Sequence, residues 1–161
     1  ASLPPDYLAK LESLWHCAPS NTVGITGPAL FNGTPAAVSR AYLGTYRCSV
    51  GSALGHPPLF GTNCSFRASW WRSVGGALDL ADTWAHDDIQ LSFAVRPGET
   101  VLYTPQLVVG MDNRALRGRR QVLERFKRGW HSMMRGFIIS PPYKRLPQRW
   151  MKGDDGVGAG L

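Results

Sequence analysis

Two adjacent aspartates, Asp87 and Asp88, are the residues of this chain whose types best suit catalysis. They follow His86 and precede Ile89 and Leu91 in the segment HDDIQLSF. A carboxylate in a pocket can act as a general base and take a proton from an attacking hydroxyl group. Acidic residues are also favoured in the first turn of a helix, where they cap backbone N–H groups and offset the helix dipole. From these residues alone, a helix cap is the better interpretation.

Positive charge is concentrated in the last third of the chain. From Arg114 to Lys152 there are 12 Lys or Arg residues and one acid, Glu124, whereas residues 1–113 contain six basic and eight acidic residues. The net charge of +7 is therefore a C-terminal feature. Such a patch suits a phosphate-bearing partner, such as a nucleotide diphosphate, an anionic membrane or a nucleic acid. A solvated helix face explains the same charge run equally well.

The sequence predicts neither a metal centre nor a disulfide framework. The four histidines are not spaced as a ligand cluster, so none is assigned to a metal. Three widely spaced cysteines without a CxxC pair favour a reducing compartment. Residues 1–12 lack the pattern of a secretory signal, and no apolar run approaches the roughly 18 to 20 residues that span a bilayer. We therefore expect a cytoplasmic protein, with peripheral attachment to a membrane left open.

Strands and helices alternate along the chain, which indicates an α/β fold. The spacing of apolar residues and the positions of helix-ending Pro and Gly predict helices at residues 7–18, 35–47, 69–75, 87–95 and 114–137. Strands are predicted at residues 22–31, 59–66, 99–103 and 107–111, with a loop at 51–58. The final segment, residues 146–161, is basic and then Gly-rich, and we expect it to be flexible because its end has nothing to bury.

Three segments, taken in order, resemble family-2 inverting glycosyltransferases of the GT-A fold. FGTNCSFRASWWRSVGG, at residues 60–76, is similar to the family's G-x-N-x-x-[FY]-R motif with its short helix and V-G-G. HDDIQLSFAVRPG, at residues 86–98, is similar to the acidic pair, helix and glycine turn that follow. ERFKRGWHSMM, at residues 124–134, is a looser match to a helix that carries Arg and Trp. The resemblance covers residues 1–137.

The resemblance implies transfer of a sugar, with inversion, from a nucleotide sugar to a hydroxyl group of an acceptor glycan or lipid. It assigns the role of general base to Asp88, with Asp87 beside it. Gly61, Thr62 and Asn63 would line the donor-sugar pocket, because a small residue permits close approach and an amide can bond to hydroxyl groups. A strand irregularity explains Gly61 equally well.

The resemblance also places the helix with Arg125, Arg128 and Trp130 near the diphosphate and the acceptor, where fixed cations stabilise the leaving group. The segment RFKRGW has one more residue than the family pattern between its last Arg and the Trp. Which Arg faces the site therefore stays open.

The same resemblance sets the expected domain organisation. Residues 1–145 would be the C-terminal, acceptor-side part of the catalytic domain, a partial GT-A-like sheet with packed helices that lacks the N-terminal nucleotide-binding half. The complete enzyme would use a divalent metal, Mg or Mn, whose D-x-D ligands are absent from this chain. We expect the chain alone to be inactive and to self-associate through an exposed sheet edge.

The alternative hypothesis is a basic binding module for nucleic acid or for an anionic membrane surface, which would use the stripe from Arg114 to Lys152. The sequence shows no Gly-rich RNA motif and no surface aromatics interleaved with these charges, which weakens this alternative.

Overall fold

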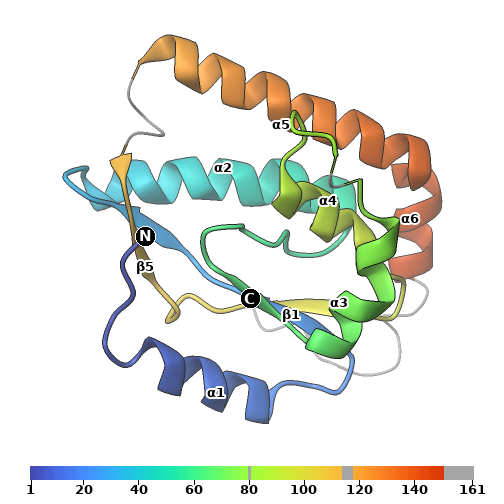
Figure 1. Cartoon of the computed structure of the whole chain (residues 1–161), viewed down its shortest axis with the longest axis horizontal. Helices are drawn as coiled ribbons and strands as arrows, with labels where there is room; N and C mark the ends of the chain where they lie inside the picture. Colours follow the sequence, from blue (N-terminus) through green and yellow to red (C-terminus); the bar gives the residue numbers. More distant parts are fainter. Residues whose placement is uncertain (80, 114–117, 151–161) are drawn as a thin grey trace.

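The computed structural model describes residues 1–79, 81–113 and 118–150. The fold is mixed α/β, with the strands between helix α1 (Tyr7–Cys17) and helix α2 (Ala36–Leu54) (Figure 1). Helix α5 (Arg119–Ile139) crosses the side of the molecule that α1 does not cover (Figure 1). The predicted fold class is thus confirmed at the level of a small mixed sheet with packed helices.

The strands form two short sheets that continue each other. Strand β1 (Thr22–Thr26) is central in the order β3-β1-β4, parallel to β4 (Thr100–Tyr103) and antiparallel to β3 (Cys64–Phe66). Strand β2 (Ala29–Phe31) pairs in parallel with β5 (Val109–Met111). In the three-stranded sheet β3 and β4 are the edges, and self-association through such an edge stays a prediction.

The predicted strand at residues 22–31 is therefore two strands of different sheets, separated at Gly27 and Pro28. A side chain at Gly27 would clash with the Leu107 carbonyl and would lie 3.0 Å from the Thr104 carbonyl. The absence of a side chain at Gly27 lets the backbone of residues 104–107 lie close to it. The strand predicted at residues 59–66 is also shorter, and only Cys64–Phe66 pairs.

The predicted loop at residues 51–58 is wrong over residues 51–54, because helix α2 runs on to Leu54, whereas residues 55–58 do lie outside helices and strands. Gly51 does not end the helix. Gly55 does, with a φ of 72° and its N–H bonded to the Gly51 carbonyl. A left-handed glycine directly after the last helical residue is a common helix terminator.

The remaining helices place the residues of interest. Helix α3 (Ala68–Val74) and a single 3-10 turn (Gly75–Ala77) follow β3, and α4 (Asp87–Ala94) begins at the acidic pair as predicted. Helix α6 (Pro142–Trp150) was not predicted, and it crosses the boundary at residue 145 that the sequence suggested. Residues 151–161 of the expected flexible tail lie outside the described residues.

Two apolar clusters fill the interior. One joins β1 and β4 to α3 through Val23, Trp70, Val74 and Val101. The other joins α1 to the strands through Tyr7, Ile25, Leu107 and Val109. Strand β1 is buried along its whole length, because Val23 belongs to one cluster and Ile25 to the other, so both of its faces are covered.

Arg145 of α6 is buried, with 4% of its surface exposed. Its guanidinium donates to the carbonyl of Leu54 at the end of α2, and to those of Ser92, Phe93 and Val95 at the end of α4. A cation at a helix C-terminus satisfies carbonyls that lack helical partners and offsets the dipole. Arg145 thus binds the ends of two helices, a role that its position in a basic run does not reveal.

Candidate active site

Asp88 lies in the first turn of α4, against the turn that precedes β3. Its Oδ2 accepts a hydrogen bond from the Gly61 N–H at 3.1 Å, and its Oδ1 accepts one from the Ile89 N–H at 2.9 Å. Asp88 is half-buried and Gly61 is exposed, so the carboxylate lies at the edge of the protein surface. A Cβ on Gly61 would lie 3.3 Å from the Asp88 Cβ, which is why a small residue suits this position.

The surroundings of Asp88 disfavour its charged form. Burial raises the pKa of Asp88, and the neighbouring Asp87 adds to this effect, while the Gly61 hydrogen bond and His86 act against it. Burial and then the Asp88 charge raise the pKa of the Cys64 thiol to about 11. Burial also raises the pKa of Tyr46, again with a contribution from Asp88, so the Tyr46 hydroxyl stays protonated. Asp87 is exposed on the same helical turn.

Asn63 takes a structural place instead of facing a ligand. It is 1% exposed, and its amide donates to the carbonyls of Pro28 at 2.8 Å and Leu107 at 2.6 Å. Its Oδ1 accepts the Tyr7 hydroxyl at 2.8 Å. Both amide hydrogens are thus used inside the protein, so binding of sugar hydroxyls by Asn63 has no support in this structure. Thr62, beside it, is half-buried, and its predicted role is untested.

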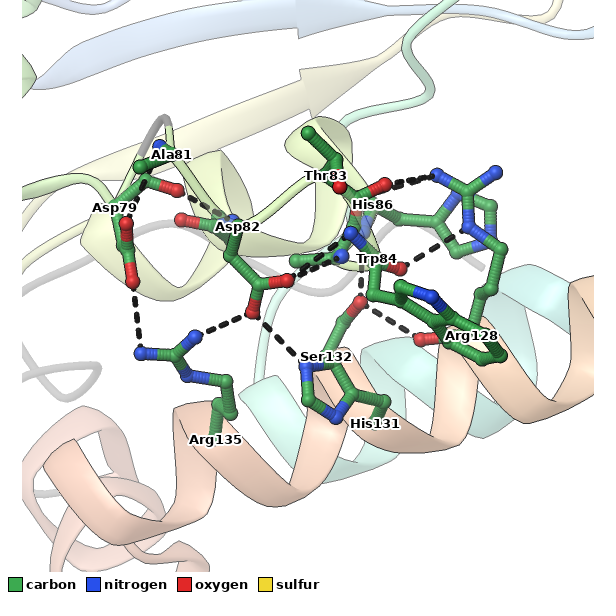
Figure 2. A network of polar contacts seen from close by, with 12 residues as sticks. Asp79, Ala81, Asp82, Thr83, Trp84, His86, Arg128, His131, Ser132 and Arg135 are labelled. Atoms are coloured by element: carbon green, nitrogen blue, oxygen red, sulfur yellow. Dashed lines mark hydrogen bonds and ion pairs between the residues drawn. The ribbon is translucent and has the colours of Figure 1, made fainter.

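The segment before α4 is fixed to α5 by a network of polar contacts (Figure 2). Arg128 donates from Nε to the Trp84 carbonyl at 3.0 Å and from Nη2 to the carbonyls of Thr83 at 3.1 Å and Ala85 at 3.5 Å. The Ser132 hydroxyl accepts the His86 N–H at 2.7 Å. Arg128 thus binds backbone carbonyls and holds the segment at the start of α4, and its predicted role at a diphosphate stays a prediction.

A second part of the network involves carboxylates. Asp82 accepts hydrogen bonds from His131, at 2.9 Å, and from Arg135, which also reaches Asp79 at 2.8 Å (Figure 2). The His131 hydrogen bond, followed by that of Arg135, lowers the pKa of Asp82. Because Arg135 already pairs with both Asp79 and Asp82, these carboxylates do not fit a metal cation. Among the residues that the structure describes, no group of three His, Cys, Asp or Glu side chains could hold a metal ion.

Arg125 and Trp130 are both exposed. They are five residues apart on a helix with 3.6 residues per turn, so they lie on different sides of α5. The structure therefore does not bring them together, and among the described residues neither side chain forms a hydrogen bond or ion pair with the Asp88 carboxylate. Their predicted roles stay predictions.

A cavity of about 450 Å³ opens between α2 and the carboxyl ends of β1 and β4. Tyr46 and Phe60 line it, so it lies beside the turn that contacts Asp88. Arg40 and Arg47 from α2 supply its positive charge, and the Arg47 guanidinium lies 4.4 Å from the centre of the Tyr103 ring. In open α/β sheets, ligands bind outside the carboxyl ends of the strands, which is where this cavity lies. No sequence pattern predicted this cavity.

No family model, no curated protein and no solved structure matches this chain. Within the described residues, no helix has both the length and the apolar composition needed to cross a membrane.

Proposed function

We propose that this chain carries the acceptor-side catalytic site of an inverting glycosyltransferase, with Asp88 as its general base. The observation that supports this proposal most directly is the half-buried Asp88 carboxylate with its raised pKa, held by Gly61 at the surface. A base with a raised pKa removes a proton more effectively than an ordinary aspartate. The order of the G-T-N turn, the V-G-G segment and the acidic pair supports the same assignment.

The proposed reaction is a single displacement. As the acceptor oxygen attacks the anomeric carbon, its proton passes to an Asp88 oxygen, and the bond from that carbon to the diphosphate breaks on the opposite face. The electron pair leaves with the nucleoside diphosphate. Each carboxylate oxygen has two lone pairs, so the hydrogen bonds from Gly61 and Ile89 leave Asp88 free to accept the proton.

The cavity beside the Phe60–Gly61 turn is proposed to bind the acceptor. Its wall is formed by apolar residues and two tyrosines, with Arg40 and Arg47 at its border. The proposal assigns only the acceptor side to this chain. A divalent metal, Mg or Mn, remains an expectation for the complete enzyme, where it would neutralise charge on the leaving diphosphate.

The test is sugar transfer by the full product of the gene that encodes this chain, measured with nucleotide sugars and product anomers resolved by NMR. Asp88→Asn keeps the shape and should lower the turnover rate by about 100- to 10,000-fold with little change in donor binding. Asp87→Asn, its neighbour in the same turn, is the matched control and should lower turnover much less. Retained anomeric configuration, or an active Asp88→Asn variant, would refute the proposal.

A further inference from the structure

Helix α5 turns apolar side chains outward. Phe126 is 72% exposed and Trp130 is 63% exposed, and Val122 and Leu123 are exposed as well. Residues 122, 126 and 130 are spaced by four and lie on one face of the helix, with 123 next to them. We call these four side chains the α5 stripe. The expectation that no surface aromatics lie among the basic residues is therefore wrong.

The opposite face of α5 is the polar one, and it is the face that packs on the protein. Arg128, His131, Ser132 and Arg135 all bond to the segment at residues 79–86 (Figure 2). An ordinary surface helix buries its apolar face and exposes its polar face. Over residues 122–130 helix α5 does the reverse, so this part of its sequence is suited to an apolar environment on the outer side. Met133, Met134 and Phe137 follow on the same side of the helix but are half-buried, and the Phe137 ring packs edge-to-face on Phe93 of α4 with 5.7 Å between ring centres.

Basic residues border the stripe. By helix geometry, Arg125 lies on one side of the α5 stripe, and Arg120 and Lys127 lie on the other. All three are exposed. The acid Glu124 is paired with Arg120, with 3.1 Å between Oε1 and Nε. The outer side of α5 therefore combines large apolar side chains with net positive charge.

We propose that the α5 stripe binds the surface of an anionic lipid bilayer, with helix α5 lying in the plane of the interface. Phe126 and Trp130 would enter the boundary between headgroups and acyl chains, while Arg125 and Lys127 contact lipid phosphates. An apolar face bordered by Lys and Arg is the pattern of helices that lie on membranes, and Trp prefers this interface. This proposal is independent of the proposed transferase activity.

Charge favours lipid over the other occupants of such a surface. A second copy of the chain would bring the same positive border against this one, which is unfavourable. A nucleic acid would need its phosphates to meet charged groups, but the centre of the outer face is apolar. An anionic bilayer satisfies both the apolar centre and the basic border.

The test is sedimentation of the whole chain with phosphatidylcholine vesicles that contain phosphatidylserine. The double variant Phe126→Gln with Trp130→Gln should weaken binding at least about tenfold for each side chain removed from the interface. Leu8→Gln is the matched apolar control, because Leu8 is 70% exposed on α1, on the far side of the molecule from α5, and should leave binding unchanged (Figure 1).

The charge contribution is tested separately. Arg125→Gln with Lys127→Gln should weaken binding by about fivefold for each charge. Arg40→Gln with Arg72→Gln removes the same charge from other helices and should have a smaller effect. Vesicles of phosphatidylcholine alone should bind less than those with phosphatidylserine. Binding that is equal for both vesicle types, or unchanged in the stripe variant, overturns the proposal.

A second measurement does not depend on removing apolar surface. Vesicles with brominated acyl chains quench tryptophans that enter the bilayer, so they should quench the wild-type protein and do so less in Trp130→Phe, which still binds. Equal quenching of both proteins overturns the proposed orientation. Analytical ultracentrifugation without vesicles, and titration with poly(U) RNA, test the other occupants. Stripe-dependent dimerisation or RNA binding without vesicle binding overturns the lipid assignment.

Discussion

Replacing Arg145 by Met should destabilise the whole fold, although its exposed neighbour tolerates the same change. Arg145 supplies hydrogen bonds to four carbonyls at the ends of α2 and α4, at distances of 2.9–3.2 Å. Methionine fills similar space but donates nothing. The carbonyls would then stay buried without this donor, and the negative ends of two helix dipoles would lose their cation.

The size of the effect follows from these contacts. A buried acceptor left without a partner costs about 1–3 kcal/mol, and removing a buried charge returns part of its desolvation cost. Two or more carbonyls left unsatisfied place the net loss in the free energy of unfolding at about 3–5 kcal/mol, a large part of the roughly 5–15 kcal/mol that stabilises a typical domain. Arg145→Lys should recover only part of the lost free energy of unfolding, because an ammonium group lacks the planar array of N–H donors of a guanidinium.

The assay is urea denaturation followed by circular dichroism. Lys144→Met is the matched control, since Lys144 precedes Arg145 in α6 and is exposed. It should change the free energy of unfolding by less than about 0.5 kcal/mol, as surface substitutions usually do. If the free energies of unfolding of Arg145→Met and Lys144→Met lie within about 1 kcal/mol of each other, the guanidinium does not hold the two helix ends.

Three further predictions concern single positions. Because burial raises the Asp88 pKa, the charged form of Asp88 destabilises the fold above that pKa. Asp88→Asn should therefore increase the free energy of unfolding at pH 7. This gain should vanish as the pH falls below the pKa of an unfolded aspartate. The pKa of Asp82 is lowered, so its stabilising effect exists at neutral pH and is lost as the pH falls through that lowered pKa. The free energy of unfolding of Asp82→Asn should be lower than that of the wild type at pH 7 and should converge with it in acid. A difference that does not change with pH would contradict the assignment. Gly27→Ala should cost about 1–3 kcal/mol in denaturation because its Cβ meets backbone carbonyls, whereas Gly44→Ala, with nothing within 4 Å, should be neutral or stabilising.

The sequence predicted the elements whose ends carry strong local signals. Asp87 at the start of α4 was such a case, because acidic residues suit a helix N-terminus. Gly51 misled the prediction for α2, since a glycine inside a helix costs only about 1 kcal/mol, which packing can exceed. The end of that helix depends on the left-handed conformation of Gly55, which is a property of the folded backbone.

The site residues also differ in how far the sequence alone could predict their surroundings. Asp88 was predicted to be a general base from its type and its flanking motifs; it lies at a surface edge where burial raises its pKa, and its catalytic role stays a proposal. Asn63 and Arg128 were predicted to face a substrate, but their bonds go to carbonyls that are distant in sequence, such as Leu107 and Trp84. A single sequence shows which groups can donate a hydrogen bond but not which carbonyl folding brings to them. Likewise, the sequence of α5 shows that one of its faces is apolar but not that this face points outward.

The parallel pairing of β1 with β4 has a consequence for synthesis on the ribosome. Thr22 pairs with Thr100, and α2, β3, α3 and α4 are all made between them. Until β4 leaves the ribosome, β1 has at most one neighbour, β3, and its other edge is open to strands of other chains. Contacts between segments so far apart in sequence form slowly. The nascent chain should therefore need a chaperone from the synthesis of Thr26 until that of Tyr103, because at least one edge of β1 stays open throughout this interval.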